Sequence, residues 1–147
     1  MDEIVLLRET EHGKLTSLYR SAGLEIGSDW IEVCHPVYSV AARRNGELLG
    51  AATVSRRFGR LVMDYLAVEP AARGLGLGRI LTARCMSFAG EAGEKALWIA
   101  AKEPEFYLHL KARETEDTAL LEDCRRCPEY EKDCKPKELV FDLKEIE

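Results

Sequence analysis

The chain has 147 residues, of which 46% are hydrophobic, and a formal net charge of −5. This length and apolar content predict a single domain over residues 1–147 with a buried core, and they exclude a disordered chain. The charge is uneven, because residues 41–84 hold eight arginines and three acidic residues, whereas both flanking regions are acidic. The overall acidity argues against a nucleic-acid partner, and the arginine-rich middle suits a polyanionic ligand.

The first residues argue against export or membrane insertion. Met1-Asp2-Glu3 lacks the basic segment of a signal peptide, and no stretch approaches the roughly 18 apolar residues of a membrane-spanning helix. We therefore expect a soluble cytoplasmic protein without a membrane partner.

A strand and two helices are expected before residue 36. Ile4 to Arg8 is a short apolar run typical of a strand. Between residues 11 and 22 apolar residues recur at helical spacing, and a glycine follows as a helix stop. A second short helix is expected at residues 28–33, with Ser28 or Asp29 as its cap.

A hairpin is expected next. Two β-rich runs, residues 37–44 and 47–57, are joined by Asn45-Gly46, the strongest short hairpin signal. Phe58-Gly59-Arg60 makes the following turn and leads into a strand at residues 61–68. Three later elements complete the pattern: a buried strand at 96–101, a helix at 104–112 and a last strand at 139–143.

The strand at residues 61–68 runs through a proline into a glycine-rich turn and then a helix at about residues 76–89. Gly74, Gly76 and Gly78 stand at alternate positions, and glycine permits both a positive φ and a close approach of the backbone to a ligand. The helix directs unpaired N–H groups and the positive end of its dipole to the same place. This pattern predicts an anion site at the turn, which we call the glycine cradle. Its residues are Leu66, Ala67, Val68, Arg73, Gly74, Leu75, Gly76, Leu77, Gly78 and Arg79.

The absence of two features narrows the classes of ligand that the glycine cradle can bind. No Lys-Ser or Lys-Thr follows the last glycine, which argues against a nucleoside triphosphate loop, and the spacing Gly-x-Gly-x-Gly is not that of a dinucleotide fingerprint. The alternative to an anion site is a tight connection between strand and helix.

The motif Arg73-x-x-Gly76-x-Gly78, preceded by Leu66-Ala67-Val68-x-Pro70, resembles the acetyl-CoA motif of the GCN5-related N-acetyltransferase (GNAT) family. More loosely, the resemblance covers residues 4–143, and the expected order of elements is similar to that of the family. It implies an α+β fold with a mixed, mostly antiparallel and splayed sheet flanked by helices. It also implies acetyl-CoA as co-substrate, with its diphosphate on the glycine cradle.

The activity that the resemblance implies is transfer of an acetyl group from acetyl-CoA to a primary amine, by direct attack within a ternary complex. No serine or cysteine nucleophile with a histidine partner is recognisable, which agrees with direct transfer. The alternative is a non-catalytic acyl-CoA or metal-responsive binding module with a cysteine-rich switch. A homodimer is common in the family.

The acceptor, a small molecule or a peptide, is not encoded in a recognisable motif. The acidic flanks hint weakly at a cationic acceptor. In the family the early region forms part of the acceptor pocket, so Trp30 and His35 are candidates to face the acceptor, and packing of Trp30 in the core is the alternative.

Tyr107 is the candidate proton donor. It matches a family tyrosine in the segment from Pro104 to Leu110, and its role would be to protonate the departing thiolate. A tyrosine with its reference pKa of about 10 stays protonated at neutral pH. The alternative for Tyr107 is an ordinary buried aromatic residue. Lys111, shortly afterwards, stands where the family commonly has glycine.

Asp64 is the candidate base. It is the only charged residue within residues 61–68, and strand alternation predicts that it shares a face with Leu66 and Val68. Some family members have a base on this face, and the main chain of Leu66 and Val68 corresponds to the family's oxyanion and pantetheine contacts. Alternatively, Asp64 pairs with an arginine or anchors a basic acceptor.

A cysteine-rich insert is expected at about residues 122–137, before the last strand. Cys124-x-x-Cys127 and Cys134 resemble half of a zinc or iron–sulfur site, which needs a fourth ligand from His109, Cys34 or a partner chain. A disulfide and inert reduced thiols are compatible with the same spacing. The metal assignment therefore stays open.

Overall fold

A computed structural model describes residues 3–24, 26–101, 103–115 and 137–143, and within these ranges seven strands form one sheet. The strands are β1 (Ile4–Arg8), β2 (Pro36–Arg44), β3 (Glu47–Arg57), β4 (Arg60–Val68), β5 (Ala96–Ala101), β6 (Arg113–Glu114) and β7 (Lys137–Asp142). The helices are η1 (His12–Leu15), α1 (Thr16–Ser21), α2 (Trp30–Cys34), η2 (Pro70–Ala72), α3 (Leu77–Glu91) and α4 (Pro104–His109), where η marks a 3-10 helix.

The sheet is mixed and mostly antiparallel. Its strand order is β1-β2-β3-β4-β5-β7-β6, and β4 and β5 are the one parallel pair among the described strands. In the described residues these two strands share a single register pair, Val62 with Trp98, and they separate beyond it. The predicted fold class, an α+β protein with a splayed and mostly antiparallel sheet, is therefore confirmed.

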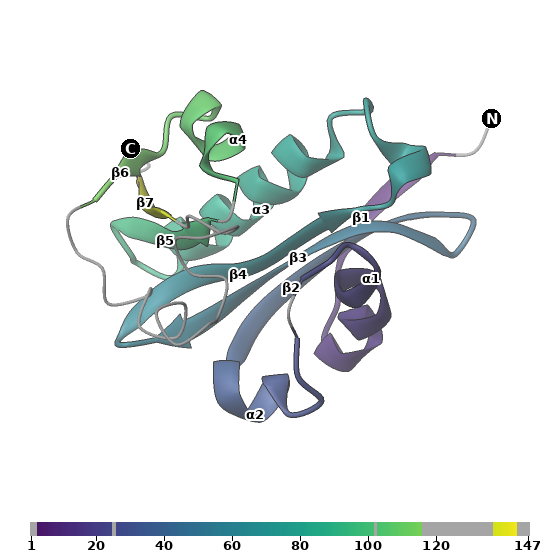
Figure 1. The fold of residues 1–147 in the computed structure, drawn as a ribbon, viewed down its shortest axis with the longest axis horizontal. Coiled ribbons are helices and arrows are strands. Elements are labelled where there is room, and N and C mark those ends of the chain that lie inside the picture. The colour runs from purple at the N-terminus through teal and green to yellow at the C-terminus, as the bar shows by residue number, and fades with distance from the viewer. Residues whose placement is uncertain (1–2, 25, 102, 116–136, 144–147) are drawn as a thin grey trace.

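Helices cover both faces of the sheet (Figure 1). On one face α3 packs against β2, β3, β4 and β5, over a core that includes Leu81, Cys85 and Phe141. On the other face α1 and α2 pack over a smaller core that includes Tyr19 and Trp30. Trp30 is 3% exposed and packs in this smaller core, as one of its two expected roles requires.

Both hairpin turns have two consecutive residues with positive φ. Asn45 and Gly46 have φ angles of 52° and 79°, as the Asn-Gly signal predicts for a type I′ turn. Phe58 and Gly59 have φ angles of 53° and 72°. Phenylalanine is a poor fit to this conformation, because a bulky side chain in the left-handed region is strained.

Several boundaries differ from the expectation. The helix expected at 104–112 ends at His109, and the short strand β6 after it was not predicted. Asp29 precedes α2, but its side chain makes no capping hydrogen bond. The last strand begins at Lys137 instead of residue 139. The expected cysteine-rich insert, with Cys124, Cys127 and Cys134, lies outside the described residues.

No helix in the part of the chain that the structure describes has the length and hydropathy to cross a membrane.

Candidate active site

The separation of β4 and β5 opens a pocket of about 630 Å³ beside the glycine cradle, which we call the cradle pocket. Its walls come from β4, the start of α3, the end of β5, α4 and the residues after α1. This volume is typical of small-molecule sites, which span roughly 300–1,000 Å³. The predicted residues of the glycine cradle that line it are Leu66, Ala67, Val68, Arg73, Gly74, Leu77 and Gly78. Leu75, Gly76 and Arg79 are not among its lining residues, and all three are exposed, the first two in the turn and Arg79 in the first turn of α3.

Each of the three glycines of the cradle is required for a specific structural reason. Gly74 and Gly76 have φ angles of 87° and 76°, which residues with a Cβ adopt only with strain. Gly78 lies so close to Phe106 that an added Cβ would be 3.1 Å from the ring. The alternating glycines therefore serve a left-handed turn at the first two positions and a close approach to α4 at the third.

The start of α3 is arranged to receive an anion. Gly76 is its N-cap, no side chain caps this end of the helix, and the first turn contains no acidic residue. The backbone N–H groups of the first turn and the positive end of the dipole of this 15-residue helix are therefore available to an external anion.

Tyr107 projects from α4 into the wall of the cradle pocket. Its ring is half-buried and makes edge contacts with Phe106 and Phe141, at centroid distances of 5.0 and 6.5 Å. Burial, with smaller contributions from Cys85 and Glu103, raises the pKa of the hydroxyl above its ordinary value. Tyr107 is therefore protonated at neutral pH, which is the state that a proton donor requires.

Asp64 lies at a β-bulge in β4. Along β3, Thr53 pairs with Tyr65 and the adjacent Val54 pairs with Met63, so the register skips Asp64. A bulge changes the phase of side-chain alternation along the strand. The prediction that Asp64 shares a face with Leu66 and Val68 is therefore wrong.

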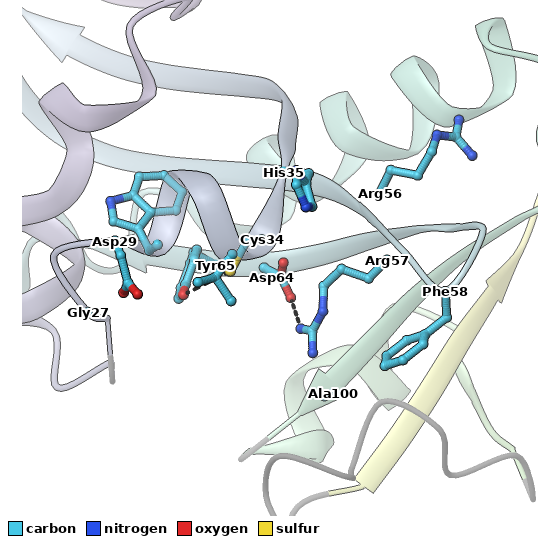
Figure 2. Close-up of a pocket in the computed structure, with 12 residues that line it drawn as sticks. Gly27, Asp29, Cys34, His35, Arg56, Arg57, Phe58, Asp64, Tyr65 and Ala100 are labelled. Atoms are coloured by element: carbon cyan, nitrogen blue, oxygen red, sulfur yellow. Dashed lines mark hydrogen bonds and ion pairs between the residues drawn. The ribbon is translucent and has the colours of Figure 1, made fainter.

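Met63 takes the position that alternation predicted for Asp64. It is 2% exposed and belongs to the core cluster against which Leu66 and Val68 pack. The carboxylate of Asp64 instead meets a side chain from the end of β3, as Figure 2 shows. Arg57 Nη1 lies 2.7 Å from Asp64 Oδ1, and the two side chains are 19% and 6% exposed. The expectation that Asp64 pairs with an arginine is thus confirmed, and its role as a base stays a prediction.

A second pocket, of about 530 Å³, lies between α2 and the β3–β4 hairpin, and we call it the hairpin pocket. Asp64 and Ala100 line both this pocket and the cradle pocket, so the two pockets meet there. In Figure 2, Asp64 stands between Tyr65 on one side and Arg57 with Phe58 on the other. Ligands bound in the two pockets can therefore approach each other beside Asp64.

One wall of the hairpin pocket is aromatic. Tyr65 stacks on Tyr19 at 5.0 Å and meets Trp30 edge-on at 5.4 Å. Trp30 Nε1 donates a hydrogen bond to Thr16 Oγ1 at 3.0 Å, which fixes the indole. Burial, with the neighbouring Cys34, raises the pKa of Tyr65, so this wall is uncharged at neutral pH. His35 is exposed and also lines the pocket, next to Cys34.

Sequence reasoning did not identify Arg57 and Phe58 as site residues. Arg57 lies at the end of a strand and Phe58 in a turn, and neither belongs to a sequence motif. The one sequence feature that indicates a special role is the dipeptide Phe58-Gly59 in a two-residue hairpin turn, where Asn-Gly or Asp-Gly is usual.

Within the described residues, no group of three or more histidine, cysteine, aspartate or glutamate side chains is arranged to hold a metal ion. The cysteines considered as metal ligands from the sequence, Cys124, Cys127 and Cys134, are outside those residues. Cys85 is fully buried on the inner face of α3.

The sequence model of the acetyltransferase (GNAT) family matches residues 5–110. A search of curated proteins found no match. Among solved structures, a GNAT family acetyltransferase from Elizabethkingia anophelis with acetyl-CoA bound is 20% identical, with a TM-score of 0.72 over 97% of this chain and 100% of its own. An acetyltransferase from Bacillus subtilis in complex with CoA is 20% identical, with a TM-score of 0.71 over 98% of this chain and 100% of its own.

A third similar structure is N-acetylglutamate synthase from Neisseria gonorrhoeae, complexed with coenzyme A and N-acetyl-glutamate. It is 18% identical, with a TM-score of 0.72 over 97% of this chain. The present chain spans 35% of that protein. At these identities the likeness establishes the fold.

Proposed function

Because this chain belongs to the acetyltransferase (GNAT) family, we propose that it transfers an acetyl group from acetyl-CoA to a primary amine within a ternary complex. The observation that carries the proposal is the meeting of two pockets at Asp64 and Ala100, one beside the glycine cradle and one beside the hairpin. Direct transfer requires such an arrangement, since the thioester and the amine must be bound side by side.

The cradle pocket is the proposed site of acetyl-CoA. The diphosphate would take the N–H groups at the start of α3, where Gly74 and Gly76 provide the turn and Arg73 and Arg79 lie close by in the chain. The pantetheine arm would follow the main chain of Leu66 to Val68, where β4 is separated from β5. Similar folds solved with acetyl-CoA or CoA bound support acetyl-CoA as the ligand.

The reaction would take place where the pockets meet. The neutral amine attacks the thioester carbonyl, a C–N bond forms, and the C–S bond breaks as the tetrahedral intermediate collapses. The sulfur leaves as a thiolate and takes the proton of Tyr107, and the amine nitrogen loses a proton to Asp64, directly or through water. Tyr107 then regains a proton from solvent and Asp64 releases its proton to solvent, so that the products are an N-acetyl amine and CoA thiol.

The direct test has two measurements on the full chain. Saturating acetyl-CoA should raise the melting temperature, because a ligand that binds only the folded state stabilises it. Release of free thiol should then require an added amine, which is screened among amino acids, polyamines and peptide N-termini. If acetyl-CoA binds but none of the amines causes thiol release, the result would favour the alternative function, a non-catalytic module that binds acyl-CoA. No shift of the melting temperature would overturn the proposal.

Two substitutions separate the proposed acid from the proposed base. Tyr107→Phe should lower kcat by about 10²–10⁴-fold, because it removes only the proton donor. Asp64→Asn should also lower kcat and should shift the pH profile of turnover. In both variants the affinity for acetyl-CoA, measured by calorimetry, should stay within about twofold of the wild type. An Asp64→Asn enzyme with an unchanged pH profile would exclude Asp64 as the base.

A further inference from the structure

The hairpin pocket carries both signs of charge close to its junction with the cradle pocket. Its acidic residues are Asp29 and Asp64, and its arginines are Arg56 and Arg57. Arg56 points away from Asp64 in Figure 2 and pairs with Glu94 at 3.3 Å. The charged group at the junction is therefore the ion pair between Arg57 and Asp64, at 2.7 Å.

An ion pair in a pocket is complementary to a ligand that carries both charges. A polycation would bring positive charge against the guanidinium of Arg57, and like charges in a partly buried site repel each other strongly. A zwitterion instead offers an ammonium to Asp64 and a carboxylate to Arg57, whose planar guanidinium matches a carboxylate. In an α-amino acid both groups are attached to one carbon, so they are spaced closely enough to bind Asp64 and Arg57 at the same time.

The uncharged walls of the pocket add a requirement for apolar surface. Tyr65 and Trp30 form one wall. Phe58, at the hairpin turn, lines the other side and is 62% exposed, with the Arg57 guanidinium 5.8 Å from its ring centroid. Phe58 keeps a φ of 53°, which a bulky residue resists, and such local strain is often retained where a side chain has a function.

We propose that the acceptor is a free α-amino acid with a bulky apolar or aromatic side chain. Its carboxylate would bind Arg57, its amine would lie beside Asp64, and its side chain would occupy the space between Phe58 and Tyr65. This inference rests on the proposed acetyltransferase function and adds the class of acceptor. Since Asp64 also lines the cradle pocket, the amine held there is next to the thioester.

Acetylation also explains how such a product leaves. The ammonium of the acceptor loses two protons, one to solvent before attack and one to Asp64 as the amide forms, and the thiolate gains one from Tyr107. The amide that results carries no positive charge. It therefore loses its attraction to Asp64, and the ion pair with Arg57 can form again.

The first experiment compares each amino acid with the amine that lacks its carboxylate. The full chain with acetyl-CoA is given L-phenylalanine or 2-phenylethylamine, and L-leucine or isoamylamine, and thiol release is followed. We expect kcat/KM to be at least about tenfold higher for each amino acid, the size of effect that a charge-assisted hydrogen bond supplies. Spermidine and glycine should be poor acceptors.

The second experiment changes the residue that is proposed to hold the carboxylate. Arg57→Gln should bring the ratio of kcat/KM for phenylalanine and phenylethylamine close to one, mainly through a higher KM for phenylalanine. Arg43→Gln is the matched control, because Arg43 pairs with Glu9 at 3.2 Å and does not line either pocket. It should keep the wild-type ratio.

The third experiment uses the strained turn. Phe58→Asn should raise the melting temperature by about 2–4 °C, because asparagine tolerates the left-handed region. The same substitution should raise KM for phenylalanine and leave KM for alanine nearly constant. Greater stability together with weaker binding of the larger acceptor is a result that a purely structural role of Phe58 does not give.

Two outcomes would overturn the inference in different ways. If amines without a carboxylate are acetylated as well as or better than the amino acids, the acceptor class is wrong and the acetyltransferase function stands. If no amine causes thiol release although acetyl-CoA binds, the proposed function fails and this inference fails with it.

Discussion

Four polar side chains form a continuous chain of hydrogen bonds beneath the aromatic wall of the hairpin pocket. His12 Nδ1 lies 2.7 Å from Ser39 Oγ, Ser39 Oγ lies 2.8 Å from Thr53 Oγ1, and Thr53 Oγ1 lies 2.7 Å from the Tyr19 hydroxyl. Ser39, Thr53 and Tyr19 are fully buried. Because Tyr19 stacks on Tyr65, this chain holds a residue of the pocket wall in place.

Thr53 is the central member of this chain, and its replacement should be costly. Thr53→Val keeps the shape but leaves the buried hydroxyls of Tyr19 and Ser39 without this partner, so we expect it to lower the free energy of unfolding by about 1–3 kcal/mol. Thr53→Ser should recover most of the loss. Urea unfolding of the three proteins measures the effect, and a valine variant as stable as the wild type would contradict it.

The sequence predicts some residues of the site and not others. Gly74 and Gly76 are predictable because their left-handed conformations are required by a turn that a few consecutive residues form. The direction in which the Asp64 side chain points is not predictable, since it depends on a bulge that forms only when β4 pairs with β3. The bulge residue sits beside Tyr65, whose aromatic side chain gives no local indication of a break in alternation.

Three helices end with the same backbone motif. In α1, α3 and α4 the residue after the C-cap has positive φ: Gly23 at 83°, Gly93 at 85° and Lys111 at 75°. At the end of α4 the N–H of Ala112 donates to the carbonyl of Tyr107 at 3.0 Å, which is the six-residue bond of a Schellman motif. The motif therefore holds the backbone of the proposed proton donor.

Lys111 occupies a position in this motif that favours glycine. Lys111→Gly should therefore raise the free energy of unfolding by about 0.5–1.5 kcal/mol, since a side chain in the left-handed region costs about 1–2 kcal/mol and glycine loses part of this gain to chain entropy. Gly93→Lys, the opposite exchange at the end of α3, should destabilise by a similar amount. Thermal and urea unfolding test both, and equal signs for the two substitutions would contradict the argument.

Element boundaries were predictable where a local signal marks them. The strand at Ile4–Arg8 and the hairpin turn at Asn45-Gly46 agree with the expectation. The end of α4 was misplaced because its stop residue is a lysine, which no local rule identifies as a helix stop. The strand β6 was not predicted because it consists of two residues and depends entirely on pairing with β7.

At the scale of the whole molecule, burial keeps one thiol and several tyrosine hydroxyls neutral at alkaline pH values at which the unfolded chain would ionise them. Burial raises the pKa of the Cys85 thiol from 9.0 to about 12. Burial also raises the pKa values of Tyr19, Tyr65 and Tyr107 above their ordinary value. In each case the folded state favours the neutral form, whereas the unfolded chain ionises at a lower pH.

The sign of the resulting pH dependence follows. The contribution of Cys85 is complete below pH 9 and is lost as the pH rises from 9.0 towards about 12, with a slope of about 1.4 kcal/mol per pH unit for one proton. Cys85→Ala should therefore have a shallower decline of the free energy of unfolding between about pH 9.5 and 11. Thr82→Ala, at another buried position of α3, should keep the wild-type slope. Urea unfolding with a reducing agent measures the slopes, and parallel curves for the cysteine variant would contradict the prediction.

The sequence by itself determined the order of most elements and the glycine-rich turn, because periodicity, turn residues and alternating glycines act over a few consecutive positions, and its motif implied the fold class through the resemblance to the GNAT family. Only the tertiary structure decided where β4 and β5 separate, how Asp64 is turned and which residues surround it. Arg57, Tyr65 and Ala100 come from three strands and Phe58 from the turn between two of them, and they meet Asp64 only after those strands pair and diverge. A glycine-rich turn built from one continuous backbone segment is therefore readable in the sequence, whereas a pocket built from side chains of separate elements exists only in the folded chain.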